Sequence, residues 1–487
     1  AVGQGAMFAN TTGTRNTAVG ANGTLTSNLT GNDNIAVGYV AMGANTTGVS
    51  NVALGAYTLD ANTTGSYNTA VGALALTDNT SSQNNTAVGY FAMGQNSTGA
   101  NNVAVGYAAL DANTTANSNT ALGYAALTEN TTGTGNTAVG AAALDANTTG
   151  GENTAVGLTC LSGNTTGNAN TAVGRTCMFT NSTGSQNTAI GRQALGANTT
   201  ASNNTAVGYH SLLSNSTGTQ NTAVGSHALD ANTTANENTA VGYFAAKLNT
   251  TGSANTVMGH NSFDANTTGG ANVAIGAQSL SSNTSADNNT AVGSFCLRDN
   301  TTGTNNTGLG RGVMILNTTG QQNVAVGSFA LDAATTADNN TAIGHGALGA
   351  TTTGAMNTAL GGDVLLNNTT GLRNTALGQN SLNANTTASN NVAVGASALA
   401  VNTTGSENVA IGTFALDSNT TAVGNVAVGY ASLEVNTTGN ENVAVGSFAL
   451  DANTTARFNT AVGQMALSAN TTAEANTGIG RTSLFAN

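Results

Sequence analysis

The sequence has no proline and no tryptophan, and only 6% of its 487 residues are charged. A chain without proline keeps every backbone N–H available for the hydrogen bonds that an interior strand must donate. Basic residues are especially scarce, since nine Lys and Arg stand against twenty-one Asp and Glu, for a net charge of −12. Nucleic-acid binding needs a basic surface, so we expect no nucleic-acid partner.

Long apolar runs and cysteines are also lacking. No stretch approaches the roughly 18 apolar residues of a membrane-spanning helix, so we expect no membrane partner in this segment. The three cysteines are Cys160, Cys177 and Cys296, and we interpret them as small half-buried residues. Cys160 and Cys177 lie one repeat apart, where stacking at ~4.8 Å would place their Cα atoms within disulfide range. Parallel Cβ vectors disfavour that bond, and the sequence leaves it open.

What the sequence has is a repeat. The pentapeptide Asn-Thr/Val-Ala-Val/Ile/Leu-Gly returns every 17 residues from Asn34 to Asn476. We number one repeat from Asn51 (position 1) to Tyr67 (position 17). Asn occupies position 1, an aliphatic residue position 4, Gly position 5, and Leu or Met position 9. Strict periods of this kind are typical of solenoids, in which each repeat is one turn that is stable only when stacked on its neighbours.

The repeat is too short for paired helices, which need about 33 or more residues per unit. Each repeat instead holds short strand-like runs separated by Gly and by Asn-Thr-Thr-Gly, which favour turns. The sequence therefore predicts an all-β fold, a parallel β-solenoid. With 487 residues and one coil per 17, it contains about 29 coils.

The array predicts a single continuous domain over residues 1–487. It is already in progress at Ala1 and is still running at Asn487. Without an initiator Met, a signal peptide or polar capping repeats, we expect a piece of a longer chain. One irregularity occurs between Asn16 and Asn34, which are 18 residues apart. The extra residue lies near 21–24, where Asn22-Gly23 favours a tight turn, and we interpret it as a one-residue bulge.

Several positions of the repeat predict structural roles. Gly55 indicates a corner with positive φ or a close approach of another segment. Asn51 and Asn62 indicate turn residues whose side-chain amides stack into ladders from coil to coil. We expect Leu54 and Leu59 to form the core of their coil.

Strand alternation then places Ala53 and Gly55 on the face opposite Leu54. The same pattern in every coil predicts a continuous stripe of small residues on the surface. Such a stripe lets backbones approach closely, so we expect copies of the chain to associate side by side along it.

Candidate chemistry is sparse. The sequence holds no P-loop, dinucleotide-binding or nucleophile-elbow motif, so we expect no enzyme and no cofactor. His210 and His227 share position 7 in neighbouring coils and could hold a metal, but we find no carboxylate suitably placed beside them and favour surface imidazoles. Asp417, Glu434 and Asp451 occupy position 10 in three successive coils, which indicates a weak Ca²⁺ site or a solvated acidic strip.

Tyr90, Tyr107 and Tyr124 stand at position 6 in three adjacent coils. They form a possible ligand surface for sugar rings, or they fill a corner or a groove between copies. The recurring Asn-Thr-Thr, as at Asn62, also matches the N-glycosylation pattern, although turn chemistry explains it without sugars. Ice binding would need a flat threonine array, but adjacent threonines at positions 13 and 14 would point to opposite faces of a strand.

The segments Asn272–Gly276 and Asn408–Gly412, each Asn-Val-Ala-Ile-Gly, are followed by Leu280 and Leu416. They resemble the head repeat of trimeric autotransporter adhesins. The longer form, with Ala-Leu and then Asn-Thr-Thr-Gly, is similar to arrays in bacterial surface proteins and phage tail fibres. The resemblance implies a left-handed β-roll that is homotrimeric and extracellular. The coil departs from that pattern by the added Asn-Thr-Thr-Gly turn.

We therefore expect a non-enzymatic extracellular fibre or adhesin segment at a cell surface or on a virion appendage. Its partners are expected to be copies of itself, as a trimer or filament, and a host-surface carbohydrate or protein. A phage tail-fibre shaft or receptor-binding segment is the first alternative. An ice-binding solenoid and a polysaccharide-cleaving β-solenoid are the others, and only the run at Asp417 offers carboxylates for cleavage.

Overall fold

The computed structural model describes residues 1–485. Over this range the chain is all-β, with 28 strands of three residues each and no helix. The coils number about 27, close to the 29 expected, and the parallel β-solenoid with a 17-residue repeat is confirmed. In the same range no helix has the length and apolar character needed to cross a membrane.

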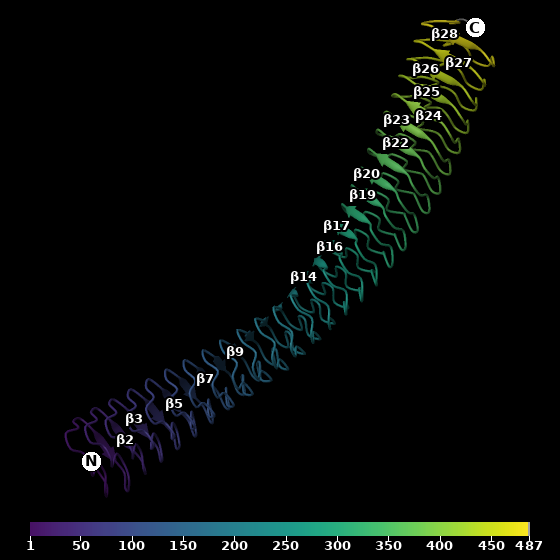
Figure 1. Ribbon diagram of the computed structural model, residues 1–487. Helices are drawn as coiled ribbons and strands as arrows, with labels where there is room; N and C mark the ends of the chain where they lie inside the picture. The colour runs from purple at the N-terminus through teal and green to yellow at the C-terminus, as the bar shows by residue number, and fades with distance from the viewer. Residues whose placement is uncertain (486–487) are drawn as a thin grey trace. The chain divides into compact units, whose positions relative to one another are not determined.

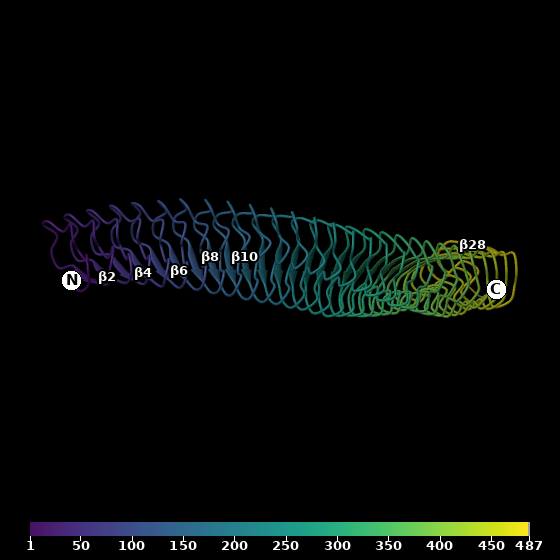
Figure 2. The ribbon, with the colours of Figure 1, turned by 90° about the horizontal axis from the view of Figure 1, so that it is seen from below.

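The chain divides into two units, of which the first is Ala1–Val241. Its strands each lie one repeat after the last, and the short arrows of successive coils lie side by side (Figures 1 and 2). The strands of this unit are β1 (Thr17–Val19), β2 (Ile35–Val37), β3 (Val52–Leu54), β4 (Thr69–Val71), β5 (Thr86–Val88), β6 (Val103–Val105), β7 (Thr120–Leu122), β8 (Thr137–Val139), β9 (Thr154–Val156), β10 (Thr171–Val173), β11 (Thr188–Ile190), β12 (Thr205–Val207), β13 (Thr222–Val224) and β14 (Thr239–Val241).

The second unit is Gly242–Asn487. Its strands are β15 (Thr256–Met258), β16 (Val273–Ile275), β17 (Thr290–Val292), β18 (Thr307–Leu309), β19 (Val324–Val326), β20 (Thr341–Ile343), β21 (Thr358–Leu360), β22 (Thr375–Leu377), β23 (Val392–Val394), β24 (Val409–Ile411), β25 (Val426–Val428), β26 (Val443–Val445), β27 (Thr460–Val462) and β28 (Thr477–Ile479).

Within each unit every strand pairs with the next in parallel and in register. Ala70 of β4 lies opposite Ala87 of β5, and Ala359 of β21 lies opposite Ala376 of β22. The register places each residue directly beside its counterpart one repeat later. Side chains at the same position of successive coils therefore lie at the spacing of neighbouring strands, about 4.8 Å.

The core differs from the one expected. Ala53 is fully buried, whereas Leu54 is 37% exposed. The prediction that position 4 points inward and that a small-residue stripe lies on the surface is therefore wrong. The strand alternates as expected, but with the opposite phase.

The width of the coil explains this phase. Gly308, at position 3 of its coil, would place a Cβ against Cys296, Val313 and Met314, which occupy positions 8 and 9 of the opposite wall. At this coil the two walls are so close that position 3 has no room even for a methyl group, and in nearly all other coils position 3 is Ala. The core of most coils is accordingly built from Ala at position 3, Ala or a similarly small residue at position 8, and Leu or Met at position 9, as with the fully buried Leu59. Buried exceptions are Val257 at position 3 and Ala246 and Phe263 at position 9.

The turns depend on positive φ angles at three non-glycine positions of the repeat. In one coil these are Tyr57 (φ 55°), Leu59 (53°) and Tyr67 (59°) at positions 7, 9 and 17. Gly55 has φ 143°, and a Cβ there would lie 2.7 Å from the carbonyl carbon and oxygen of Gly72. Conformation and space therefore both require glycine at position 5.

The asparagines at positions 1 and 12 form two buried ladders. The Asn51 side-chain N–H donates to Gly65 O (2.8 Å), and the Asn51 backbone N–H donates to Asn34 Oδ1 (3.0 Å). The Asn62 amide donates to Asn45 Oδ1 (2.8 Å) and to Gly65 O (3.0 Å). Asn51 and Asn62 are both fully buried. Each ladder closes a turn and joins it to the preceding coil.

The irregular coil near the start is accommodated locally. Thr24 Oγ donates to Gly38 O in the same way that Thr58 Oγ donates to Gly72 O. Three residues, 21–23, separate Gly20 from Thr24, whereas two separate Gly55 from Thr58. The additional residue therefore lies between positions 5 and 8, and the ladders on either side continue unbroken.

Candidate functional sites

The turn at positions 7 to 10 brings two side chains of one coil together. His227 at position 7 and Leu229 at position 9 both have positive φ (56° and 52°). With this backbone the side chains at positions 7 and 10 lie on the same side. His227 Nδ1 is 2.7 Å from Asp230 Oδ2, and about four-fifths of each side chain is covered.

His210 lies beside this pair, one coil earlier. Its ring centroid is 5.1 Å from that of His227, at an interplanar angle of 80°. One ligand atom from each of His210, His227 and Asp230 lies within 4.8 Å of the others. The expectation that no suitable carboxylate stands beside the histidines is therefore wrong.

The three residues of this cluster can be read from the sequence, but their proximity becomes apparent only from the geometry of the turn. Asp230 follows His227 by three residues, a spacing that in a strand would separate the two side chains. Only the paired left-handed residues place them in contact.

Two neighbours hold the first imidazole in place. The His210 Nε2 atom lies 2.8 Å from Gln193 Oε1, which accepts the hydrogen bond. The Tyr209 ring stacks on His210 with centroids 3.8 Å apart. Burial lowers the pKa of His210, and the nearby Arg192 and His227 charges act in the same direction against the Asp230 carboxylate.

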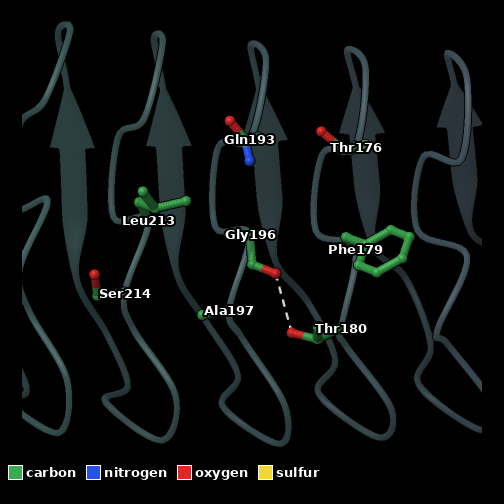
Figure 3. Close-up of a pocket in the computed structure, with 8 residues that line it drawn as sticks. All are labelled: Thr176, Phe179, Thr180, Gln193, Gly196, Ala197, Leu213 and Ser214. Carbon is green, nitrogen blue, oxygen red and sulfur yellow. Dashed lines mark hydrogen bonds between the residues drawn. The ribbon is translucent and has the colours of Figure 1, made fainter.

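A groove of about 500 Å³ adjoins the cluster and shares Gln193 with it. Phe179 and Leu213 occupy position 10 in the coils on either side of Gly196, which has no side chain there (Figure 3). Thr180 Oγ donates to Gly196 O (3.0 Å) at the floor. The groove is thus a notch that Gly196 leaves between two coils with large side chains at position 10.

The tyrosines predicted as a ligand surface do stack. The Tyr90 and Tyr107 rings are 5.6 Å apart and nearly parallel, as are those of Tyr107 and Tyr124 at 5.3 Å. Each is at least half exposed. The three rings form a continuous aromatic strip within the first unit, with the geometry that a flat apolar ring face can contact.

The acidic run occupies neighbouring coils of the second unit. Burial, and secondarily the charge of Glu434, raise the pKa of Asp417. The same two causes raise the pKa of Asp451, while hydrogen bonds from the backbone lower it in part. Within residues 1–485 these three carboxylates do not bring their oxygens as close together as the ligand atoms of the histidine cluster. The geometry thus gives no additional support to a calcium site over a solvated acidic strip.

The cysteines are buried free thiols. Burial raises the pKa of Cys296 to about 12. The pKa of Cys177 is also raised, by a hydrogen bond with Cys160 and by burial. Cys177 and Cys296 are therefore not reactive thiolates at neutral pH.

The outer face of the strands is a surface that repeats from coil to coil. We call the side chains at positions 2 and 4 of the described strands the strand face. Position 2 is always Thr, Val or Ile, and position 4 is always Val, Leu, Ile or Met. Many of these side chains are well exposed, for example Leu122 at 46% and Leu309 at 48%. The strand face carries no charge in either unit.

The Asn-Thr-Thr turns are less available than their sequence suggests. Asn62 is fully buried with both amide hydrogens donated, so the folded chain offers no glycosylation acceptor there. The first threonine, Thr63, donates its hydroxyl to Thr80 O (3.0 Å) rather than to solvent. The second threonine, as at Thr64 and Thr149, is exposed in most coils, whereas the threonines at position 2 of the strands, as at Thr69 and Thr154, are mostly half-buried.

No family model matches this chain, and no curated protein is significantly similar to it.

Proposed function

We propose that the chain is a non-enzymatic structural segment of an extracellular fibre or adhesin, whose copies associate through the strand face. The uncharged strand face is the observation that carries this proposal. An array that repeats one coil many times builds length and repeated surface, and it gathers few chemically distinct groups in one place.

The partner that fits the strand face best is a second copy of the chain. Only an identical repeat matches the spacing of the strands over many coils, and β-branched and aliphatic side chains interdigitate well between facing sheets. Each strand offers about 35 Å², taken as ~4.8 Å by ~7 Å. The 14 strands of either unit offer roughly 490 Å² per copy, so two copies that meet along one unit bury about 1,000 Å² in total, which reaches the size of a specific protein interface.

Charge favours the same arrangement. The acidic and basic side chains lie outside the strand face, as with Asp230 at position 10 and Arg192 at position 6. Copies that meet at the strand face therefore bury no unpaired charge. The resemblance to adhesin heads supports an extracellular location and three copies, and the stacked tyrosines Tyr90, Tyr107 and Tyr124 are the surface that we propose for a carbohydrate ligand.

Sedimentation of the purified chain tests the self-association. We expect the wild type to sediment as an oligomer at about 10 µM, and the double variant Leu377→Lys/Ile411→Lys, on the third residues of β22 and β24, to sediment as a smaller species. Val401→Lys is the matched control, because Val401 is 43% exposed but lies outside the strand face. A monomeric wild type, or a control that dissociates equally, would contradict the proposal.

A second candidate function, ice binding, is favoured by one observation. The strand face repeats Thr at position 2 and an aliphatic residue at position 4 in strict register, as in β8 to β14. Such a lattice of hydroxyl and methyl groups is a flat ordered surface for water. Thermal hysteresis tests this function: ice binding requires hysteresis in the wild type that the variant Val173→Lys/Val207→Lys, on the third residues of β10 and β12 within that lattice, reduces. Absence of hysteresis in the wild type would exclude it.

A further inference from the structure

We propose that His210, His227 and Asp230 form a binding site for one Zn²⁺ ion per chain. The ligand atoms of the three side chains lie within 4.8 Å of one another. Two imidazoles and one carboxylate, with a water in the fourth position, form a ligand set that zinc accepts in tetrahedral geometry.

The distances leave room for the ion with small movements. Two ligand atoms on one tetrahedral zinc are about 3.3 Å apart, because each bond is about 2.0 to 2.1 Å long. His227 Nδ1 and Asp230 Oδ2 are 2.7 Å apart. A rotation of the carboxylate that moves its oxygen by a fraction of an ångström therefore makes room for the ion. The His227 ring then carries its proton on Nε2, and no proton is lost from a neutral imidazole.

The surroundings hold His210 ready to bind. Gln193 Oε1 can only accept a hydrogen bond, so the His210 Nε2 atom at 2.8 Å carries the proton and Nδ1 carries the lone pair. The stacked Tyr209 ring limits rotation of the imidazole. A partner that fixes the tautomer of a ligating histidine typically contributes about 10- to 100-fold to metal affinity.

The other histidines lack this combination. His345 lies 3.5 Å from a carboxylate oxygen of Asp363, but its side chain is 70% exposed. Within residues 1–485 the set at His210 is the only group of three such side chains with ligand atoms this close. His345 and Asp363 thus provide a matched pair without a second imidazole.

The test is a titration of the full chain, freed of metal by a chelator, with ZnCl₂ in a calorimeter. We expect one site per chain with a Kd of about 10 µM or tighter. His210→Ala and His227→Ala should each weaken binding at least 30-fold, whereas His345→Ala should bind as the wild type does. Gln193→Ala, which keeps all three ligands, should weaken binding about 10-fold.

Cobalt provides a second readout. Co²⁺ in the same site should give the intense visible absorption of tetrahedral coordination, and His210→Ala should lose it. Circular dichroism establishes whether each variant is folded. If alanine at a ligand position prevents folding, the Gln193→Ala variant, which keeps all three ligands, is used for the test instead. The proposal is overturned if the wild type binds zinc more weakly than about 100 µM, if His345→Ala loses as much affinity as His210→Ala, or if Gln193→Ala binds like the wild type.

Discussion

Two successive coils of the second unit lack asparagine in the buried ladder at position 12, and the first of them allows a repair to be predicted. Position 12 is Ala334 in this coil. In the preceding coil Asn317 Nδ2 donates to Asn300 Oδ1 (2.7 Å), but Asn317 Oδ1 is buried and has no hydrogen-bond partner. The missing donor is the amide that an asparagine at 334 would supply. We therefore expect Ala334→Asn to stabilise this part of the solenoid.

The coil at residues 187–203 shows that the change fits. It has alanine at position 15, as the coil of Ala334 does, and its Asn198 Nδ2 donates both to Asn181 Oδ1 (2.6 Å) and to Ala201 O (3.0 Å). An asparagine at 334 would make the equivalent bonds to Asn317 Oδ1 and Ala337 O. The hydroxyl of Thr351, at position 12 of the next coil, can donate to the new side-chain oxygen.

The gain can be worked from these contacts. Two new hydrogen bonds contribute about 1 to 3 kcal/mol, and satisfying a buried acceptor contributes at the upper end of that range. Ordering the new side chain costs less than about 1 kcal/mol. The net expectation is about 2 kcal/mol, which corresponds to roughly 30-fold slower exchange of the amides that open with this coil.

Native-state hydrogen exchange of the amides of Thr318 and Thr335 measures this gain. Ala333→Asn is the control, because Ala333 is only half-buried and lies outside the ladder, and exchange there should change less than about threefold. Asn385→Ala is the reverse experiment, since Asn385 donates to Asn368 Oδ1 (2.8 Å) and accepts from Asn402 (3.1 Å). Unchanged or faster exchange in Ala334→Asn would refute the reasoning.

Three further predictions follow from the core, the corner and the acidic column. Leu110→Ala should lower the free energy of unfolding by about 2 to 5 kcal/mol in urea denaturation, because Leu110 is fully buried. Leu122 is 46% exposed on the strand face, so Leu122→Ala should lower it by less than about 1 kcal/mol. Equal losses in the two variants would contradict the assigned core. Gly106→Ala should lower the free energy of unfolding by more than about 3 kcal/mol or prevent folding, because φ is 141° and the new Cβ would clash with the carbonyl of the next coil. Circular dichroism and the midpoint of urea denaturation measure this effect. A midpoint equal to that of the wild type would contradict the requirement for glycine at position 5. Burial raises the pKa of Asp111 to about 6, so the stability gained by protonation is complete below about pH 4 and is lost as the pH rises through 6. Asp111→Asn should therefore be more stable than the wild type at pH 7.5 by about 1 to 2 kcal/mol, after allowance for the partial exposure of Asp111, and equal to it at pH 3.5. Asp60→Asn is the control, since Asp60 Oδ1 already accepts a hydrogen bond from a threonine hydroxyl at 2.7 Å, and a gain as large there would refute the explanation.

The candidate sites were only partly predictable. His210 and His227 could be paired from their shared position in the repeat, because the in-register stack places equal positions side by side. Asp230 could not be added, because its approach to His227 depends on left-handed residues at positions 7 and 9. Nothing in the residue types His227 and Leu229 favours positive φ over the ordinary conformations of a side-chain-bearing residue.

The phase of the strand shows the same limit. Strand alternation requires that one of Ala53 and Leu54 points inward and the other outward. Hydrophobicity favours burial of the leucine, which is the wrong choice here. The opposite wall decides otherwise, because Leu59 and the small residue at position 8 already fill the coil and leave room for a methyl group only. The volume available between the two walls of the coil therefore decides which residue is buried, and a local sequence pattern does not give that volume.

The sequence alone determined the period, the parallel in-register stack, the asparagine ladders and the need for glycine at position 5. Each of these follows from strict repetition, because identical units of extended chain satisfy their backbone hydrogen bonds by stacking in register. The tertiary structure alone decided which face of the strand is the core, which side chains meet across the turn at positions 7 to 10, and where an uncharged surface remains exposed. These depend on how close two walls of a coil come, and that distance is set only when the whole turn has closed.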